Sequence, residues 1–180
     1  MENMEKIRHS LAHILASAVK NLYPDVKFGI GPAIENGFYY DFGDLKISDS
    51  DLPKIEQEMK KIIAKDIKFK KKNITKAEAK KLFKNQPYKL ELIKELKKIT
   101  IYESGDFIDL CSGPHIDSTQ EINSDAFKLT RTAGAYWKGS EKNKMLTRIY
   151  GLAFENKEGI KSFLKIQEEA EKRDHRKLGA

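Results

Sequence analysis

The sequence Arg8-His9-Ser10-Leu11-Ala12-His13 lies in a segment, residues 5 to 22, whose apolar residues recur at helical spacing. In a helix, residues four apart share one face, with Cβ atoms roughly 5–6 Å apart. His9 and His13 are therefore expected to point into one small polar site. A second segment, Asp109-Leu110-Cys111-Ser112-Gly113-Pro114-His115, supplies another histidine and the only cysteine. Three of the four histidines fall in these two stretches, which makes them the first candidates for function.

Charge and cysteine content narrow the class of protein. The 180 residues carry a formal charge of +7, which favours a polyanionic partner, with nucleic acid as the first candidate. A lone cysteine forms no internal disulfide, so a reducing, cytoplasmic location is expected. The sequence contains neither a signal peptide nor a run of about 18 apolar residues, and membrane insertion is set aside.

The N-terminal half predicts helices alternating with extended segments. Pro24 ends the first helix, and a second is expected from Ser50 or Asp51 to about Lys65, with Pro53 in its first turn. Helical spacing gives the first helix an apolar stripe at Ile7, Leu11, Ile14, Leu15, Ala18 and Leu22. Extended segments are expected at 27–32 and 37–42, joined by a loop of more than two residues that contains Asn36-Gly37.

The region from residue 67 to 96 is rich in lysine. Residues 67 to 74 predict an exposed edge strand, and Thr75-Lys76-Ala77-Glu78 is a capping box that opens a short helix. Residues 88 to 96 fit both a strand, through alternating Tyr88, Leu90 and Leu92, and a helix, through Leu90, Ile93 and Leu96; helix is favoured.

The C-terminal half predicts mainly strands. They are expected at 100–102, 107–110, 126–129, 135–138 and 145–150, and a charged helix follows from Lys157 to Arg173, leading into a connector. These elements predict an α+β fold, in which helices pack on one side of an antiparallel sheet and the histidine-bearing N-terminal helix lies across it.

Two kinds of chemistry fit the histidine and cysteine residues. His9, His13, Cys111 and His115 are the ligand types of a zinc site. Four protein ligands would fill every coordination position of a tetrahedral zinc ion, however, and would leave none for a reactive water. The alternative is a metal-free site in which a histidine acts as general base, because its pKa suits that role near neutral pH. Cys111 taken alone fits a small buried apolar residue, with thiol chemistry as a minor alternative.

The two motifs closely resemble the editing domain of bacterial-type threonyl-tRNA synthetase. The resemblance continues through the whole chain, in Ile30-Gly31-Pro32, Asn36-Gly37-Phe38-Tyr39-Tyr40-Asp41, Thr132-Ala133-Gly134-Ala135-Tyr136-Trp137, Asn143-Lys144-Met145-Leu146 and Arg173-Asp174-His175-Arg176. The editing domain of alanyl-tRNA synthetase is similar in the four metal-type residues. The Gly37-to-Asp41 and Ala135-to-Gly139 segments point to the threonyl branch.

The resemblance implies hydrolysis of serine mischarged on threonine tRNA. Residues 1–156 would form the editing domain, with a possible lysine-rich subdomain at 48–98, and residues 157–180 would form the C-terminal helix and connector to a catalytic domain. The ligase active site would lie outside this chain. The partners implied are the tRNA acceptor end carrying serine and the rest of the synthetase.

Residue roles follow from the same resemblance. His9 would activate water and Lys89 would be a second catalytic group near the ester. His13, Cys111 and His115 would shape the pocket, while Asp109 and Tyr40 would orient the substrate. No cofactor is favoured, and a zinc ion held by the two histidines of the first motif with Cys111 and His115 is the alternative. The competing functions are a zinc-dependent deacylase of the alanyl type and a catalytically silent tRNA-binding appendage.

Overall fold

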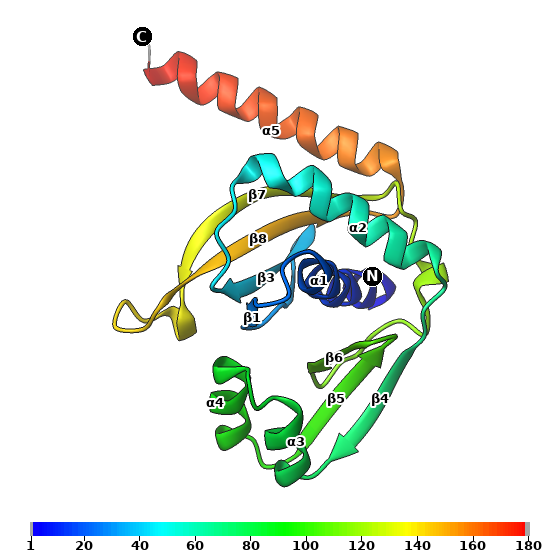
Figure 1. The fold of residues 1–180 in the computed structure, drawn as a ribbon. Coiled ribbons are helices and arrows are strands. Elements are labelled where there is room, and N and C mark those ends of the chain that lie inside the picture. The colour runs from blue at the N-terminus through cyan, green and yellow to red at the C-terminus, as the bar shows by residue number, and fades with distance from the viewer. Residues whose placement is uncertain (1, 179–180) are drawn as a thin grey trace.

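The computed structural model describes residues 2–178 and has an α+β fold, as the sequence predicts (Figure 1). Helix α1 (Glu2–Leu22) lies across a five-stranded antiparallel sheet. The remaining strands form a second, three-stranded antiparallel sheet on the other side of α1. The expected single sheet is therefore two sheets, and the histidine-bearing helix lies between them.

The larger sheet has the strand order β1-β3-β8-β7, with β2 paired to β3. Its strands are β1 (Lys27–Phe28), β2 (Ala33–Ile34), β3 (Gly37–Gly43), β7 (Phe127–Tyr136) and β8 (Met145–Ala153). The strand predicted at 126–129 and the first two residues of the one predicted at 135–138 belong to a single strand, β7, and Trp137 and Lys138 lie in a 3-10 turn. A register shift between Leu129 and Arg131 accommodates the extra residue, so that pairing with β8 continues on both sides of it.

The turn between β2 and β3 is shorter than predicted. Ile34 pairs with Gly37, so only Glu35 and Asn36 form the loop. Asn36 has a φ of 65°, a left-handed conformation that asparagine tolerates better than most residues. The Asn-Gly pair does mark the hairpin, but its glycine is the first residue of β3.

The smaller sheet contains the lysine-rich strand and carries two short helices. Its order is β4-β5-β6, with β4 (Phe69–Ile74) at one edge, β5 (Ile99–Ser104) in the centre and β6 (Phe107–Leu110) at the other edge. Helices α3 (Lys76–Leu82) and α4 (Pro87–Glu95) connect β4 to β5. Thr75 caps α3 by accepting a hydrogen bond from the Glu78 backbone, which is the N-cap half of the predicted capping box, and α4 confirms the helical alternative for the ambiguous segment.

Two further helices flank the larger sheet. Helix α2 (Leu52–Ala64) packs on α1, with Pro53 in its first turn as predicted. Helix α5 (Lys157–Leu178) runs on through the predicted connector at 173–177, and residues 179 and 180 lie outside the described part of the chain. The remaining elements are short 3-10 turns at Asp49–Asp51, Thr119–Glu121 and Trp137–Gly139. Between residues 2 and 178, no helix has the length and apolar character needed to cross a membrane.

Helix α1 is buried on every side over its central turns, not on one stripe only. Every residue from Ser10 to Val19 is buried, whereas the stripe ends at Ile7 and Leu22 are only partly buried. A helix that is enclosed all round needs apolar or small residues on all faces. The sequence supplies them outside the stripe mainly as alanine and serine, so the one large polar side chain in this segment is His13.

His13 is enclosed between α1 and the smaller sheet. Its ring contacts Phe69 and Phe107 edge-on, at centroid distances of 5.2 and 4.8 Å, and its Nε2 lies 2.7 Å from the Ser104 Oγ. Burial, assisted by the charge of Lys89, lowers the pKa of His13 from 6.5 to about 3. This imidazole is therefore neutral at physiological pH and is part of the core.

The buried His13 predicts an acid-sensitive fold. The unfolded chain takes up a proton at this residue below about pH 6.5 and the folded chain does not, so the free energy of unfolding falls as the pH drops towards 3, by up to about 1.4 kcal/mol per pH unit. Urea denaturation between pH 7 and 4 should show a shallower pH dependence for His13→Gln. The exposed His175→Gln variant should keep the wild-type dependence, and the same slope in all three proteins would contradict the assignment.

Candidate active site

A pocket of about 350 Å³ lies between α1, α4 and the end of β6. Its lining includes six of the seven site residues predicted from the sequence. These six are His9, His13, Lys89, Asp109, Cys111 and His115. The seventh, Tyr40, lies behind the pocket and donates a hydrogen bond to the Asp109 Oδ2 at 2.9 Å. Residues that are up to 106 positions apart in the sequence thus surround one cavity.

His9 has a defined arrangement of protons. Its Nδ1 lies 3.2 Å from the carbonyl oxygen of Pro114, which accepts hydrogen bonds only, so Nδ1 carries the proton. Burial lowers the pKa of His9 below its ordinary value of 6.5, although the bond to Pro114 and the charge of Asp109 oppose the shift. His9 is therefore a neutral imidazole with an unprotonated Nε2, and a lone pair on that atom is what a general base requires.

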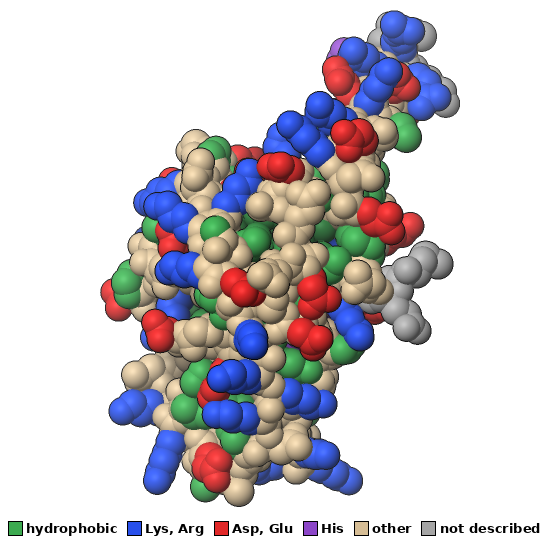
Figure 2. Space-filling view, turned by 90° about the vertical axis from the view of Figure 1, so that its right-hand side faces the viewer, with side chains coloured by type: hydrophobic (Ala, Val, Ile, Leu, Met, Phe, Trp, Pro, Cys, Tyr) green, Lys and Arg blue, Asp and Glu red, His purple; other side chains and the backbone are tan. Residues whose placement is uncertain are grey.

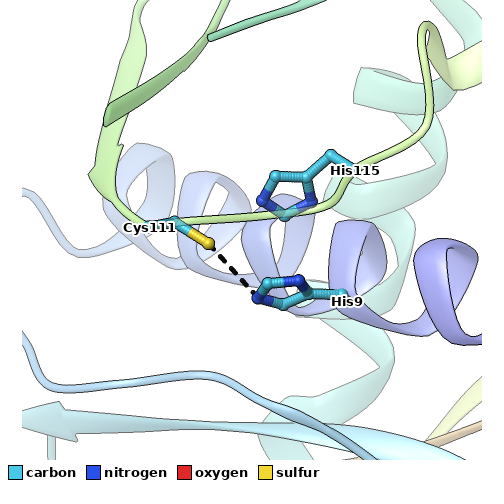
Figure 3. A group of neighbouring side chains, drawn as sticks. All are labelled: His9, Cys111 and His115. Atoms are coloured by element: carbon cyan, nitrogen blue, oxygen red, sulfur yellow. Dashed lines mark hydrogen bonds between the residues drawn. The ribbon is translucent and has the colours of Figure 1, made fainter. Parts of the chain in front are cut away.

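Cys111 faces this lone pair. Its Sγ lies 3.3 Å from His9 Nε2, and Figure 3 shows the two side chains meeting from α1 and the loop after β6. The backbone N–H of Gly113 also donates to the sulfur, at 3.3 Å. Burial nevertheless raises the pKa of the thiol to about 11, so the side chain is a protonated S–H donor at neutral pH. A thiol in that state is a poor nucleophile.

His115 is stacked on His9, with ring centroids 4.4 Å apart and an angle of 26° between the planes (Figure 3). Its Nδ1 lies 3.0 Å from the hydroxyl of Ser10. Its Nε2 is buried and has no hydrogen-bond partner among residues 2–178. Burial lowers the pKa of His115 to about 2, so the ring is neutral. An unpartnered nitrogen in the lining of a pocket marks a place for a ligand atom.

Lys89 and Asp109 form a buried ion pair. The Lys89 Nζ lies 2.7 Å from the Asp109 Oδ1, and the two side chains are 2% and 8% exposed. The phenol of Tyr40 occupies the second carboxylate oxygen, and burial together with the Asp109 charge raises the Tyr40 pKa well above 10. The three side chains thus join α4, β6 and β3. Removing one partner would leave a buried charge without compensation, which is strongly unfavourable.

Three of the four residues predicted as zinc ligands come together. The ligand atoms of His9, Cys111 and His115 lie within 4.8 Å of one another. His13 is outside this group, and Ser104 holds its Nε2. Three protein ligands would leave the fourth position of a tetrahedral zinc open for a water molecule. The objection that four protein ligands exclude a reactive water therefore does not apply to this set. The donor types and the unpartnered His115 Nε2 fit such an ion.

Several lining residues were not identified from the sequence. Leu92 and Leu96 of the α4 region, three and seven positions after Lys89, contribute to the wall of the pocket, as does Lys98. Helical spacing from Lys89 would have indicated the two leucines. Gly31 also lines the pocket, and a Cβ at this position would collide with the Tyr40 ring. The absence of a side chain at Gly31 therefore lets this segment lie close against the site.

Comparison with known proteins identifies similar chains. Residues 99–150, which include Asp109, Cys111 and His115, match the family model of the threonyl and alanyl tRNA synthetase second additional domain. Threonine–tRNA ligases from Thermotoga petrophila, Acetivibrio thermocellus and Staphylococcus carnosus are 58%, 56% and 52% identical to the chain, over 99%, 96% and 99% of its length.

The chain spans only 28% of the length of each of these three relatives. The similarity nevertheless extends over nearly all of the chain, from the histidine-bearing helix to α5. The resemblance seen in the sequence motifs is confirmed: residues 99–150 match the second additional domain of threonyl and alanyl tRNA synthetases, and nearly the whole chain is similar to the editing-domain segment of bacterial-type threonyl-tRNA synthetases.

Proposed function

We propose that the pocket hydrolyses the ester between serine and threonine tRNA, so that the chain acts as a proofreading module. The observation that carries the proposal is the lining of one cavity by a neutral His9, whose Nε2 lone pair accepts only the weak hydrogen bond of the Cys111 thiol, and by the Lys89–Asp109 pair. A base and a cation beside a common space are what ester hydrolysis by water requires.

In this mechanism His9 Nε2 takes a proton from water as the water oxygen attacks the ester carbonyl. The bond to Pro114 keeps the ring oriented and stabilises the imidazolium that forms. The Lys89 ammonium stabilises the negative charge that develops on the carbonyl oxygen. When the bond to the ribose oxygen breaks, the proton passes from His9 to that oxygen, and the products are serine and tRNA with a free terminal hydroxyl.

The need for such a step follows from the small difference between the two amino acids. Serine lacks one methyl group of threonine, and a pocket distinguishes one such group by only about 1–3 kcal/mol. A synthetic site that binds threonine therefore also accepts serine, with only this small difference in free energy against it. A second pocket that excludes the additional methyl group corrects the error, because steric exclusion rejects the larger substrate. His13 and the Asp109 carboxylate, both in the lining, would border the amino acid in the proposed complex.

The distribution of charge supports an RNA partner that approaches from the side of the smaller sheet. Residues 65–98 contain thirteen lysines and four acidic residues, a formal charge of +9, whereas the rest of the chain has 21 basic and 23 acidic residues. Twelve of these lysines are exposed, and Lys89 is the buried exception. Figure 2 shows Lys and Arg side chains around the lower end of the molecule, where Figure 1 places α3 and β4. Phosphates are the natural counterpart of such a surface.

Zinc-assisted hydrolysis is the second candidate, because His9, Cys111 and His115 are close enough to share an ion. The bound metal would supply an activated water at neutral pH. Cys111 would then have to lose its proton, and His9 would be a ligand and could not be the base. The two candidates therefore assign different tasks to the same imidazole.

Deacylation tests the proposal directly. Purified protein should release serine from mischarged threonine tRNA at least about tenfold faster than it releases threonine, since one methyl group accounts for the discrimination. Treatment with a chelator, followed by metal analysis, should leave the metal-free rate unchanged. Equal rates on the two esters would contradict selective editing, tRNA binding without hydrolysis would indicate a silent appendage, and chelator-sensitive turnover with stoichiometric zinc would favour the metal candidate.

Substitutions at the two proposed catalytic residues should reduce the rate more than binding. We expect His9→Ala and Lys89→Met to lower kcat by about 100-fold or more and to leave tRNA affinity nearly unchanged. Single-turnover hydrolysis and filter binding measure the two quantities. Lys61→Met, at an exposed lysine on α2, is the matched control, and Lys89→Arg tests whether charge alone suffices when the neutral variant folds poorly. Equal losses in rate and affinity would assign His9 and Lys89 to substrate positioning.

Charge reversal tests the basic surface. In the double variant Lys94→Glu/Lys97→Glu, tRNA affinity should fall and the salt dependence of log K should become shallower by about two, because each substituted lysine no longer neutralises a phosphate. The exposed pair Lys161→Glu/Lys165→Glu on α5 has the same change in net charge and is expected to behave like the wild type. The same effect from both double variants would mean that net charge, and not this surface, governs binding.

A further inference from the structure

Ser10 is completely buried on α1, next to the proposed base, and it connects the helix to the His115 loop. Its Oγ lies 3.0 Å from His115 Nδ1 and 3.1 Å from the backbone nitrogen of Ile116. Among the described residues, these two nitrogens are the hydrogen-bond partners of the hydroxyl. The neighbouring residue on the helix is His9. One turn of α1 therefore carries the His9 ring and, through Ser10, binds the His115 ring that stacks on it.

The positions of the protons follow from this pair of bonds. The Ile116 N–H is necessarily a donor, so the Ser10 oxygen accepts that bond. The oxygen could accept a second bond from Nδ1–H, but the buried hydroxyl proton would then have no acceptor among residues 2–178. Donation from the hydroxyl to the Nδ1 lone pair of His115 therefore satisfies more of the buried groups. A neutral imidazole that accepts at Nδ1 carries its proton at Nε2, and Nε2 is the atom that has no partner among the described residues.

We propose that Ser10 is a positioning residue that holds His115 as the Nε2–H tautomer and so makes it a hydrogen-bond donor to the substrate. His9 is held by Pro114 in the opposite tautomer, with Nδ1 protonated. The two stacked rings therefore offer an acceptor and a donor to the same pocket. The His115 Nε2–H would donate a hydrogen bond to an oxygen of the aminoacyl group. This use rests on the proposed hydrolytic function, whereas the tautomer of the free protein does not.

This assignment separates the two imidazoles by chemistry although their rings are stacked neighbours. The His9 nitrogen can take a proton from water, and the His115 nitrogen can only donate one to an acceptor. With the opposite tautomer, His115 would present a second lone pair, which repels a carbonyl oxygen and suits a metal ion. The Nε2–H tautomer of His115 thus favours an acceptor oxygen of a substrate at this nitrogen, and the opposite tautomer favours a metal ion.

Long-range proton–nitrogen NMR correlations on the unliganded wild-type protein, labelled with 15N in histidine, test the tautomer without any assay of hydrolysis. The His115 resonances, identified by their loss in His115→Gln, should show a protonated Nε2 and an unprotonated Nδ1. The His9 resonances should show the reverse. A protonated Nδ1 at His115 would overturn the proposal, even if the protein hydrolyses seryl-tRNA, and the expected tautomer in an inactive protein would remove the proposed function only.

Variants then measure what the tautomer contributes. In Ser10→Ala, His115 should populate both tautomers, and kcat for seryl-tRNA should fall by about tenfold, the effect of one hydrogen bond, with KM within about twofold of the wild type. Ser10→Thr keeps the hydroxyl and should restore both the spectrum and the rate. Ser17→Ala removes another buried hydroxyl from α1 and is the matched control. An unchanged His115 spectrum in Ser10→Ala would also refute the role of Ser10.

Discussion

The enclosure of α1 between two sheets is the constraint on which the rest of the structure depends. A helix with solvent on one side leaves its polar side chains to water, but over Ser10 to Val19 no such side exists. Each buried polar group must then find a protein partner. Ser104 provides one for His13, and the loop after β6 provides those for Ser10 and His9. The bonds of His9 and Ser10 also place Cys111 and His115 at the pocket, whereas the Nδ1 of His13 has no partner among residues 2–178.

The ion pair of Lys89 and Asp109 connects a third layer to this arrangement. It joins α4 to β6, and the Tyr40 hydroxyl extends the connection to β3 in the larger sheet. Paired buried charges cost free energy relative to well-packed apolar side chains, so stability alone does not account for them. Their position in the pocket lining accounts for them better, since a preorganised charge in a site of low polarity acts more strongly on a substrate than an exposed one does.

Local patterns in the sequence predicted the α+β class and the helices, and they placed His9 and His13 on one face of α1, because these features depend on spacing within one element. The partners of these residues could not be predicted in the same way. Nothing near Lys89 in the sequence indicates that it is buried, since the cause is a carboxylate twenty positions away. The division into two sheets depends on the pairing of β4 with β5 across two helices, which no local pattern specifies. The group of three possible ligands, without His13, likewise arises only when helix and loop meet.

The charge of the chain is unevenly distributed between its layers. The positive pole lies over β4, α3 and α4, the layer that also carries Lys89 into the pocket, while the remainder of the chain is slightly negative. The electric field of a polyanion rotates such a molecule before the two make contact. At low ionic strength the field also raises the rate of productive encounters. The chain would thus approach a nucleic acid already turned so that the pocket-bearing end leads, and added salt would weaken this alignment.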